Sequence, residues 1–133
     1  MNLVKLIKLP RFDEDCGDLV VIDAKSNNVP FRIRRIFNVR SPINSIRGKH
    51  AHRNCAQFLI CTNGSIEVKC DNGVEVQKFI LNKSNLGLLV LPGVWAEQKY
   101  LQENTVLTVI CDQRYAEDDY IREYEEFLNF VNS

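Results

Sequence analysis

The chain has 133 residues, of which 45% are hydrophobic and 26% charged, and we expect one globular domain over residues 1–133. Seventeen basic side chains balance seventeen acidic ones, so we expect neither nucleic acid nor an anionic membrane as a partner. The N-terminal stretch MNLVKLIKLPRF lacks the apolar core of a secretion signal, and no apolar run is long enough to span a bilayer.

Strand patterns begin near residue 19. The segments LVVID, at 19–23, and FRIRRIFNV, at 31–39, are rich in β-branched and aromatic residues, and we expect a strand in each. In the second segment apolar residues alternate along one face, and Arg35 falls on that same face. Because a buried charge needs a partner, we expect Arg35 to pair with an acidic side chain or to await a ligand phosphate.

The middle of the chain has the strongest strand signals. QFLICT, at 57–62, and SIEVKC, at 65–70, flank the dipeptide Asn63-Gly64, which suits a type I′ turn and predicts a hairpin. Turn residues bound three further predicted strands, at 74–81, 86–91 and 105–111. Many short antiparallel strands at regular spacing predict an all-β sandwich or barrel.

The last part of the chain changes period. In DDYIREYEEFLNFV, at 118–131, apolar residues recur at helical spacing, which predicts one amphipathic helix. Asp118 is expected to cap its N-terminus, where an acidic first turn also suits the helix dipole. We expect this helix to pack across one end or edge of the β structure.

The cysteines do not suggest a disulfide framework. Five are present, with no CxxC pair, at positions 16, 55, 61, 70 and 111. An odd count without that spacing favours reduced thiols that pack as small hydrophobic side chains. We therefore expect a cytoplasmic protein.

Both histidines of the chain lie two residues apart in RGKHAHRNCAQ, at 47–57. Residues i and i+2 of a strand face the same side, so on a strand the rings of His50 and His52 project together. In a barrel that side can be the cavity. Such a pair can hold a metal, transfer a proton or merely pack, and for an isolated HxH packing is the commoner outcome.

The surrounding residues resemble the two motifs of the cupin superfamily. The first motif runs G, HxH, E and G, and its matches are Gly48, His50, His52, Gln57 and Gly64. The second runs G, P and H, and its matches are Gly87, Pro92 and Ala96. Metal cupins use three histidines and a carboxylate, but Gln57 and Ala96 replace two of these ligands. Because two imidazoles alone make a weak site, we expect no bound metal, unless Glu97 or Glu67 completes the set.

Histidines without a metal are suited to acid–base work. Their ordinary pKa lies near neutrality, so both protonation states are available. Two adjacent imidazoles also disfavour double protonation, so one of them stays neutral, as a base requires.

Five segments carry a closer resemblance: VPFRIRRI, RGKHAHR, GSIEVKCDNG, GLLVLPGVWAEQ and DDYIREYEEFLNFV. Together they resemble the sugar 3,4-ketoisomerases, WxcM-like cupin enzymes that act on dTDP-4-keto-6-deoxyglucose. The resemblance implies an antiparallel jelly-roll barrel with a C-terminal α-helix, a homodimer with exchanged strands, and no metal or organic cofactor. The implied reaction moves the carbonyl from C4 to C3 through an enediol or enediolate, toward amino sugars of bacterial surface polysaccharides such as O-antigen.

The resemblance also assigns roles to residues. His50 and His52 are the expected base and acid, in an order that stays open. Arg47 is expected to steady the enediolate or hold a phosphate, and Arg35 to hold the diphosphate through its guanidinium fork. For both arginines the alternative is a structural ion pair. The remaining candidates for substrate binding are Gln57, Trp95 and Glu97.

Some of these positions have open interpretations. Gln57 is suited to hydrogen-bond a histidine or a sugar hydroxyl, whereas Trp95 either stacks on the ligand or fills the core. Three residues depart from the family pattern: Phe37 stands where tyrosine is common, Ala96 replaces a larger polar residue, and Cys16 lies where an Asp-x-Arg-Gly pattern is common. These changes could alter the substrate, abolish activity, or select the gluco or galacto product.

Three rival functions stay open on the sequence. A cupin that binds a sugar nucleotide without chemistry is supported by Phe37 and Ala96. A metal-dependent cupin dioxygenase requires a metal site that the motif does not complete. A 3,5-epimerase shares the fold class and the proton abstraction, but its motifs match less well.

Overall fold

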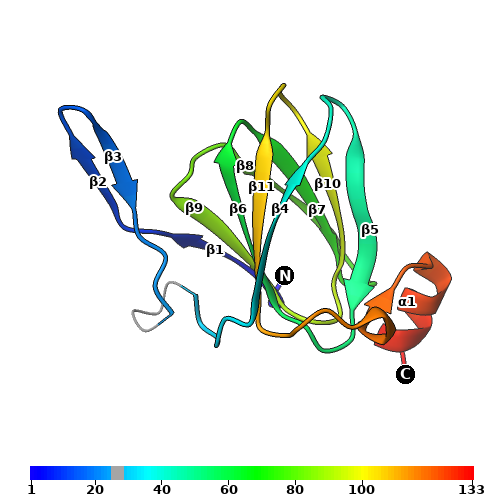
Figure 1. Cartoon of the computed structure of the whole chain (residues 1–133). Coiled ribbons are helices and arrows are strands. Elements are labelled where there is room, and N and C mark those ends of the chain that lie inside the picture. Colours follow the sequence, from blue (N-terminus) through cyan, green and yellow to red (C-terminus); the bar gives the residue numbers. More distant parts are fainter. Residues whose placement is uncertain (25–28) are drawn as a thin grey trace.

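Two five-stranded antiparallel sheets face each other in the computed structural model, which describes residues 1–24 and 29–133 (Figure 1). The first sheet has the order β1-β9-β6-β11-β4, formed by Val4–Lys8, Leu86–Val90, Gln57–Asn63, Val106–Cys111 and Arg35–Arg40. The second has the order β12-β5-β10-β7-β8, formed by Tyr120–Ile121, Ile46–His52, Trp95–Tyr100, Ile66–Asp71 and Val76–Leu81. The predicted all-β jelly-roll barrel with a C-terminal helix is therefore confirmed.

The barrel interior follows from the alternation of side chains along each strand. Inward-facing residues of both sheets form one core cluster, which includes Leu59, Val68, Leu81, Leu88 and Val109. Strand β6 is buried on both faces, because a second cluster covers the outer face of its sheet. Phe58 of β6 belongs to that outer cluster, and its ring lies directly over Gly87, where any Cβ would overlap it.

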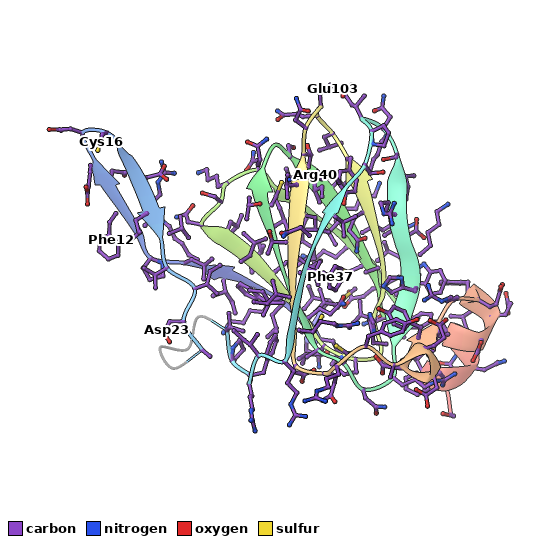
Figure 2. All side chains as sticks on the ribbon, in the orientation of Figure 1. Phe12, Cys16, Asp23, Phe37, Arg40 and Glu103 are labelled. Atoms are coloured by element: carbon purple, nitrogen blue, oxygen red, sulfur yellow. The ribbon has the colours of Figure 1, made fainter. Side chains whose placement is uncertain are left out.

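A two-stranded hairpin stands away from the barrel. It consists of β2 (Arg11–Glu14) and β3 (Gly17–Val20), and Figure 2 shows Phe12 and Cys16 on it, well separated from the barrel. The predicted strand at 19–23 therefore ends early, at Val20. Cys16 is exposed, which corrects the prediction of a packed thiol there, whereas the other four cysteines are buried and unpaired.

The predicted hairpin around Asn63-Gly64 is wrong. Both strands exist, but β6 pairs with β9 and β11, whereas β7 pairs with β8 and β10. The turn therefore carries the chain from one sheet to the other. Gly64 adopts φ of 87° there, which suits glycine, and the expected turn chemistry is found with a different topology. Among the described residues, β7 and β8 form the hairpin in this region instead, around Asp71–Gly73.

The C-terminal helix is shorter than predicted. A 3₁₀ turn at Glu117–Asp119 and the short strand β12 precede α1, which spans only Tyr124–Val131. Asp118 does not cap α1, because the N-cap position is occupied by Glu123. The side chain of Glu123 makes no capping hydrogen bond. Residues 119–121 are instead held by β5, since Tyr120 pairs with His52 and Ile121 with Ala51.

Helix α1 packs on the outer face of the second sheet, as Figure 1 shows at the end of β5. Phe127 joins Ala51, Trp95 and Ile121 in a separate buried cluster. The strand predicted at 31–39 begins only at Arg35, with β4, so residues 31–34 lie outside it. Strands β1, β2 and β10 were not predicted. Within the described residues, no helix is long and apolar enough to cross a membrane.

Candidate active site

A cavity of about 190 Å³ opens into the barrel between the two sheets. Its walls combine mostly apolar side chains of the first sheet, with Gln57 as the polar exception, and polar side chains of the second sheet and of the segment before α1. The apolar lining includes Phe37, Leu59, Leu107 and Val109. The polar lining includes Arg47, His50, Gln57, Gln98, Tyr120 and Arg122. A concave site with an apolar wall and a few converging polar groups is the usual form of a small-molecule site.

Strand β5 places both histidines on the same side, as their spacing predicted. Their ring centroids are 5.1 Å apart, and the ring of Tyr120 lies 5.1 Å from that of His50 and 4.5 Å from that of His52. His50 lines the cavity, and its Nδ1 lies 3.1 Å from the carbonyl oxygen of Gly48. A neutral His50 therefore donates from Nδ1 to this carbonyl and keeps Nε2 as an acceptor.

Asp119 holds His52 from behind. The Nδ1 of His52 lies 2.7 Å from Oδ2 of Asp119, and both residues are buried. The other oxygen, Oδ1, accepts hydrogen bonds from the backbone amides of Asn54 and Cys55, at 2.6 and 3.3 Å. Among the described residues, Nε2 of His52 has no hydrogen-bond partner, although it is buried. An unpartnered buried nitrogen beside a cavity is a group left for a ligand.

The pKa values of these groups favour neutral imidazoles beside a carboxylate. Burial, followed by the neighbouring charge of His52, lowers the pKa of His50 from 6.5 to about 4. Burial also lowers the pKa of His52, although Asp119 opposes that shift. Burial raises the pKa of Asp119, but the bonds from His52 and the two amides outweigh it and hold the pKa below its usual value. Neutral His52 therefore donates its Nδ1 proton to ionised Asp119 and keeps Nε2 free to accept one.

The same region brings together ligand-type atoms of His52, Cys55 and Asp119, which lie within 4.8 Å of one another. The hydrogen bonds already engage Nδ1 of His52 and both oxygens of Asp119. These bonds account for the cluster without an ion. Gln57 and Ala96, the two replaced motif positions, supply no further ligand of the usual type.

A family model described as FdtA: WxcM-like, C-terminal, matches residues 2–132 of the chain. The chain belongs to the FdtA family. The resemblance predicted from the sequence is thereby confirmed.

Three known isomerases are similar to nearly the whole chain. A TDP-4-oxo-6-deoxy-α-D-glucose-3,4-oxoisomerase from Aneurinibacillus thermoaerophilus is 34% identical, over 96% of this chain and 91% of the relative. A His→Asn mutant of the 3,4-ketoisomerase QdtA from Thermoanaerobacterium thermosaccharolyticum, in complex with TDP-4-keto-6-deoxyglucose, matches with a TM-score of 0.94 and 32% identity, over 99% and 96% of the two chains. A 3,4-ketoisomerase from Helicobacter canadensis matches with a TM-score of 0.92 and 31% identity, over 98% of each chain.

Not every predicted site residue of this FdtA-family chain reaches the cavity. Arg47, His50 and Gln57 line it, but Trp95 and Glu97 do not, and His52 lies behind the lining with its ring against those of His50 and Tyr120. Trp95 is buried against α1 with its ring 5.8 Å from that of Phe127, and its Nε1 donates to Oε2 of Glu97 at 2.9 Å. These contacts favour the interpretation of Trp95 as a core residue over that of a residue that stacks on the ligand. Its neighbour Glu97 borders a shallow groove on the outside of the second sheet.

Arg35 points inward, as predicted, but lies beneath the cavity wall. Its Nη2 lies 3.5 Å from Sγ of Cys111, and its guanidinium carbon lies 5.4 Å from the ring centroid of Phe37 and 5.7 Å from that of Tyr115. In the part of the chain that the structure describes, no carboxylate forms an ion pair with it. Of the two partners expected for Arg35, an acidic side chain is therefore not found in the described residues, and a ligand phosphate stays a prediction.

Three residues near the histidines were missed in the sequence, in addition to Gln98 of the cavity lining. Asp119, Tyr120 and Arg122 lie in the segment that was assigned to the helix, and each is brought to the histidines by the pairing of β12 with β5. Arg122 stacks over Tyr120, with 4.4 Å from its guanidinium carbon to the ring centroid, and donates to Glu117 from Nε at 2.9 Å and from Nη2 at 3.1 Å. The one available signal was the β-prone pair Tyr120-Ile121 ahead of the helical period.

Proposed function

We propose that this chain is a sugar-nucleotide 3,4-ketoisomerase that moves the carbonyl of dTDP-4-keto-6-deoxyglucose from C4 to C3. The observation that carries the proposal is the His52–Asp119 pair, whose buried Nε2 has no partner in the described residues and whose ring lies against that of His50, a residue of the cavity lining. The reaction needs one group to move a proton between carbons and another to move a proton between oxygens. Two neutral histidines on one strand face supply both, and the names of the relatives support the same chemistry.

We assign the carbon-bound proton to His52. The ketone at C4 acidifies the C3 proton, which Nε2 of His52 removes to leave an enediolate. The carboxylate of Asp119, 2.7 Å from Nδ1, stabilises the imidazolium that forms, so His52 is the stronger base of the pair. The proton on His52 exchanges with solvent while the enediolate is bound, and His52 then delivers a proton to C4. The face from which C4 is approached sets the configuration of the product.

We assign the oxygen-bound proton to His50. Its Nε2 accepts the proton of the C3 hydroxyl and passes it to the oxygen at C4, so that the ketone reforms at C3. The hydrogen bond from Nδ1 to Gly48 fixes the tautomer that this transfer requires. Proton transfers from C3 to C4 and from O3 to O4 balance the reaction, and no cofactor takes part in these steps.

The rest of the cavity suits a nucleotide-linked sugar. Two guanidinium groups, those of Arg47 and Arg122, line it and offer forks for a diphosphate. The carboxamide of Gln57 lies on the same lining and can bond a sugar hydroxyl. Phe37 presents an apolar ring where a tyrosine is common in the family, so the histidines have no phenol partner from that position.

The test follows the sugar by proton NMR in D₂O with purified protein and dTDP-4-keto-6-deoxyglucose. We expect 3-keto product with deuterium at C4 from the wild type. Asparagine places an amide where Nδ1 stood, so His50→Asn and His52→Asn keep the bonds to Gly48 and Asp119 while removing Nε2. We expect each to slow product formation by roughly 10²–10⁴-fold while still binding dTDP in calorimetry.

The NMR experiment, together with a metal analysis, separates the isomerase from a binding cupin and from a dioxygenase. Wild-type protein that binds the nucleotide sugar but leaves its C3 proton and carbonyl untouched would be a binding cupin. Stoichiometric iron, nickel or manganese in protein purified without chelators, together with oxygen consumption, would favour a dioxygenase. Product formation that survives in both asparagine variants would overturn the assigned roles.

We also propose that the single domain over 1–133 forms a cytoplasmic homodimer with exchanged strands. The β2–β3 hairpin supports this, because it leaves the barrel with Phe12 54% exposed and Leu19 58% exposed. Apolar side chains on a projecting arm gain stability when a second copy covers them. We expect Phe12→Ser with Leu19→Ser to shift the protein from dimer to monomer in light scattering, and an unchanged dimer would contradict the arm's role.

A further inference from the structure

Three adjacent strands place a row of polar side chains next to the cavity, and one member of the row, Gln57, lines it. Cys111 on β11 pairs in register with Arg35 on β4 and with Gln57 on β6, so the three side chains share one inward face. Nη2 of Arg35 and Nε2 of Gln57 each lie 3.5 Å from Sγ of Cys111. The thiol is fully buried between them.

The charge in this row is not balanced by a carboxylate. A guanidinium stays protonated in proteins, and a half-buried one needs an anion close by. In the described residues Arg35 has no carboxylate partner, and its Nε is buried without any hydrogen bond. The ionisable groups near it are the thiol of Cys111, the phenols of Tyr115 and Tyr120, and the imidazole of His52, which cannot supply an anion. A thiol ionises far more readily than a phenol.

We propose that Cys111 is held as a thiolate that neutralises Arg35 and, through its bond to Nε2, turns Oε1 of Gln57 toward the cavity. In the described residues, Oε1 accepts no hydrogen bond, and Gln57 lines the cavity directly. Cys111 is then a positioning residue, because it reaches the substrate only through Gln57. The thiolate half of this inference is independent of the proposed isomerase function, whereas the positioning half rests on it.

The surroundings of Cys111 differ from those of the other buried thiols. The Cys55 thiol in the loop before β6 lowers the pKa of Cys111, as do Arg35 and Gln57, and together they outweigh burial. Burial raises the pKa of Cys61 to about 11 and that of Cys70 to about 12, since neither faces a cation. Cys55 itself has a raised pKa, because it keeps its proton beside the Cys111 anion. Cys61 and Cys70 therefore serve as controls for Cys111 within the same chain.

The first experiment measures the ultraviolet absorption band of thiolates against pH in a Cys16→Ser background, which removes the exposed thiol. We expect a band for one thiolate at about pH 7, below the ordinary titration of cysteine. Adding Cys111→Ser should abolish that band, whereas adding the control Cys61→Ser should leave it unchanged. A band at neutral pH that persists without Cys111, or none in the Cys16→Ser protein, would overturn the thiolate.

The second experiment compares two variants of nearly equal shape. Cys111→Asp keeps an anion beside Arg35, and Cys111→Asn does not. We expect the melting temperature of the aspartate variant to exceed that of the asparagine variant by about 4 °C. If Cys111 were a neutral buried thiol, aspartate would bury a new charge and melt lower, which would contradict the proposal.

Activity separates the two halves. We expect Cys111→Asn to reduce kcat for isomerisation roughly tenfold, with a smaller change in KM, and Cys111→Asp to recover most of that loss. Equal kcat values in both variants and in the wild type would refute the positioning role. Should the wild type bind dTDP without isomerising it, the proposed function fails, and the absorbance and melting comparisons still decide whether Cys111 is a thiolate.

Discussion

The two halves of the barrel interior use the same alternation of side chains for different purposes. Around β7, β8 and β9, inward positions are filled by apolar residues such as Val68, Leu81 and Leu88, which are fully buried. Around β4, β5 and β11, inward positions include Arg35, His50, His52 and Cys111, of which His50 lines the cavity. The packed half, around β7, β8 and β9, stabilises the barrel by burial. The polar half, around β4, β5 and β11, holds ionisable groups close together.

The cysteines show what the difference does to chemistry. Cys70, in the packed half, has a pKa raised to about 12 by burial alone. Cys111 is buried to the same degree, but its pKa is lowered by the Cys55 thiol, Arg35 and Gln57. Burial does not by itself decide protonation, because the neighbouring polar groups also shift the pKa. Substitutions in the polar half should therefore reduce activity, whereas substitutions in the packed half should reduce the free energy of unfolding.

The largest effect is expected in the polar half, from Asp119→Asn. The amide keeps the size of the carboxylate but removes the charge that stabilises protonated His52, and it presents a donor to Nδ1 in one of its two orientations. We expect kcat for isomerisation to fall roughly 10³-fold, with dTDP binding retained. Steady-state kinetics and calorimetry measure the two quantities.

The control for that prediction is Asp118→Asn, a neighbouring residue of the same 3₁₀ turn that makes no bond to the histidines. It should leave kcat within about twofold of the wild type. Loss of dTDP binding in Asp119→Asn would mean that the carboxylate supports the local fold through Asn54 and Cys55, and not the base.

The sequence predicted the packed half better than the polar half. Strands β7, β8 and β9 follow from their own periodicity and turn residues, since local pattern and burial agree there. The inward side chain of Arg35 and the common face of His50 and His52 also follow, because a period of two fixes the face.

Asp119 could not be predicted in the same way, because its role depends on a contact with His52 across 67 positions of sequence. The apolar spacing of 118–131 suits a helix, yet pairing with β5 overrides it for Tyr120 and Ile121. The exchange of sheets at Asn63-Gly64 was missed for a similar reason, because a turn signal does not say which strands pair.

The next effect is expected in the packed half, from Leu81→Ala. Leu81 is fully buried in the main core cluster on β8, a strand that contributes no residue to the cavity lining. We expect the free energy of unfolding to fall by about 2–5 kcal/mol in urea denaturation, through lost burial and a residual cavity. At a temperature where the variant is folded, kcat should stay within about twofold of the wild type. A large fall in kcat there would show that the two halves are coupled.

A smaller effect concerns pH. The folded pKa of His50, about 4, lies below its ordinary value of 6.5, so the unfolded chain binds more protons between these two values. The stability that neutral His50 contributes is therefore complete above about pH 6.5 and is lost as the pH falls toward about 4. We expect the melting temperature to fall over that window, and less steeply in the His50→Asn, His52→Asn protein. Equal slopes in both proteins would place the acid sensitivity outside the histidine pair.

The smallest effect is expected at the rim of the polar half, from Glu117→Gln. Glu117 holds Arg122 through two hydrogen bonds in a solvent-exposed pair, so its removal should hardly change stability. Arg122 would still line the cavity, but its guanidinium would no longer be fixed for a diphosphate. We expect KM to rise roughly threefold with kcat unchanged, because the lost positioning affects substrate and transition state alike. A fall in kcat without a change in KM would instead assign Arg122 to the chemical step and not to substrate binding.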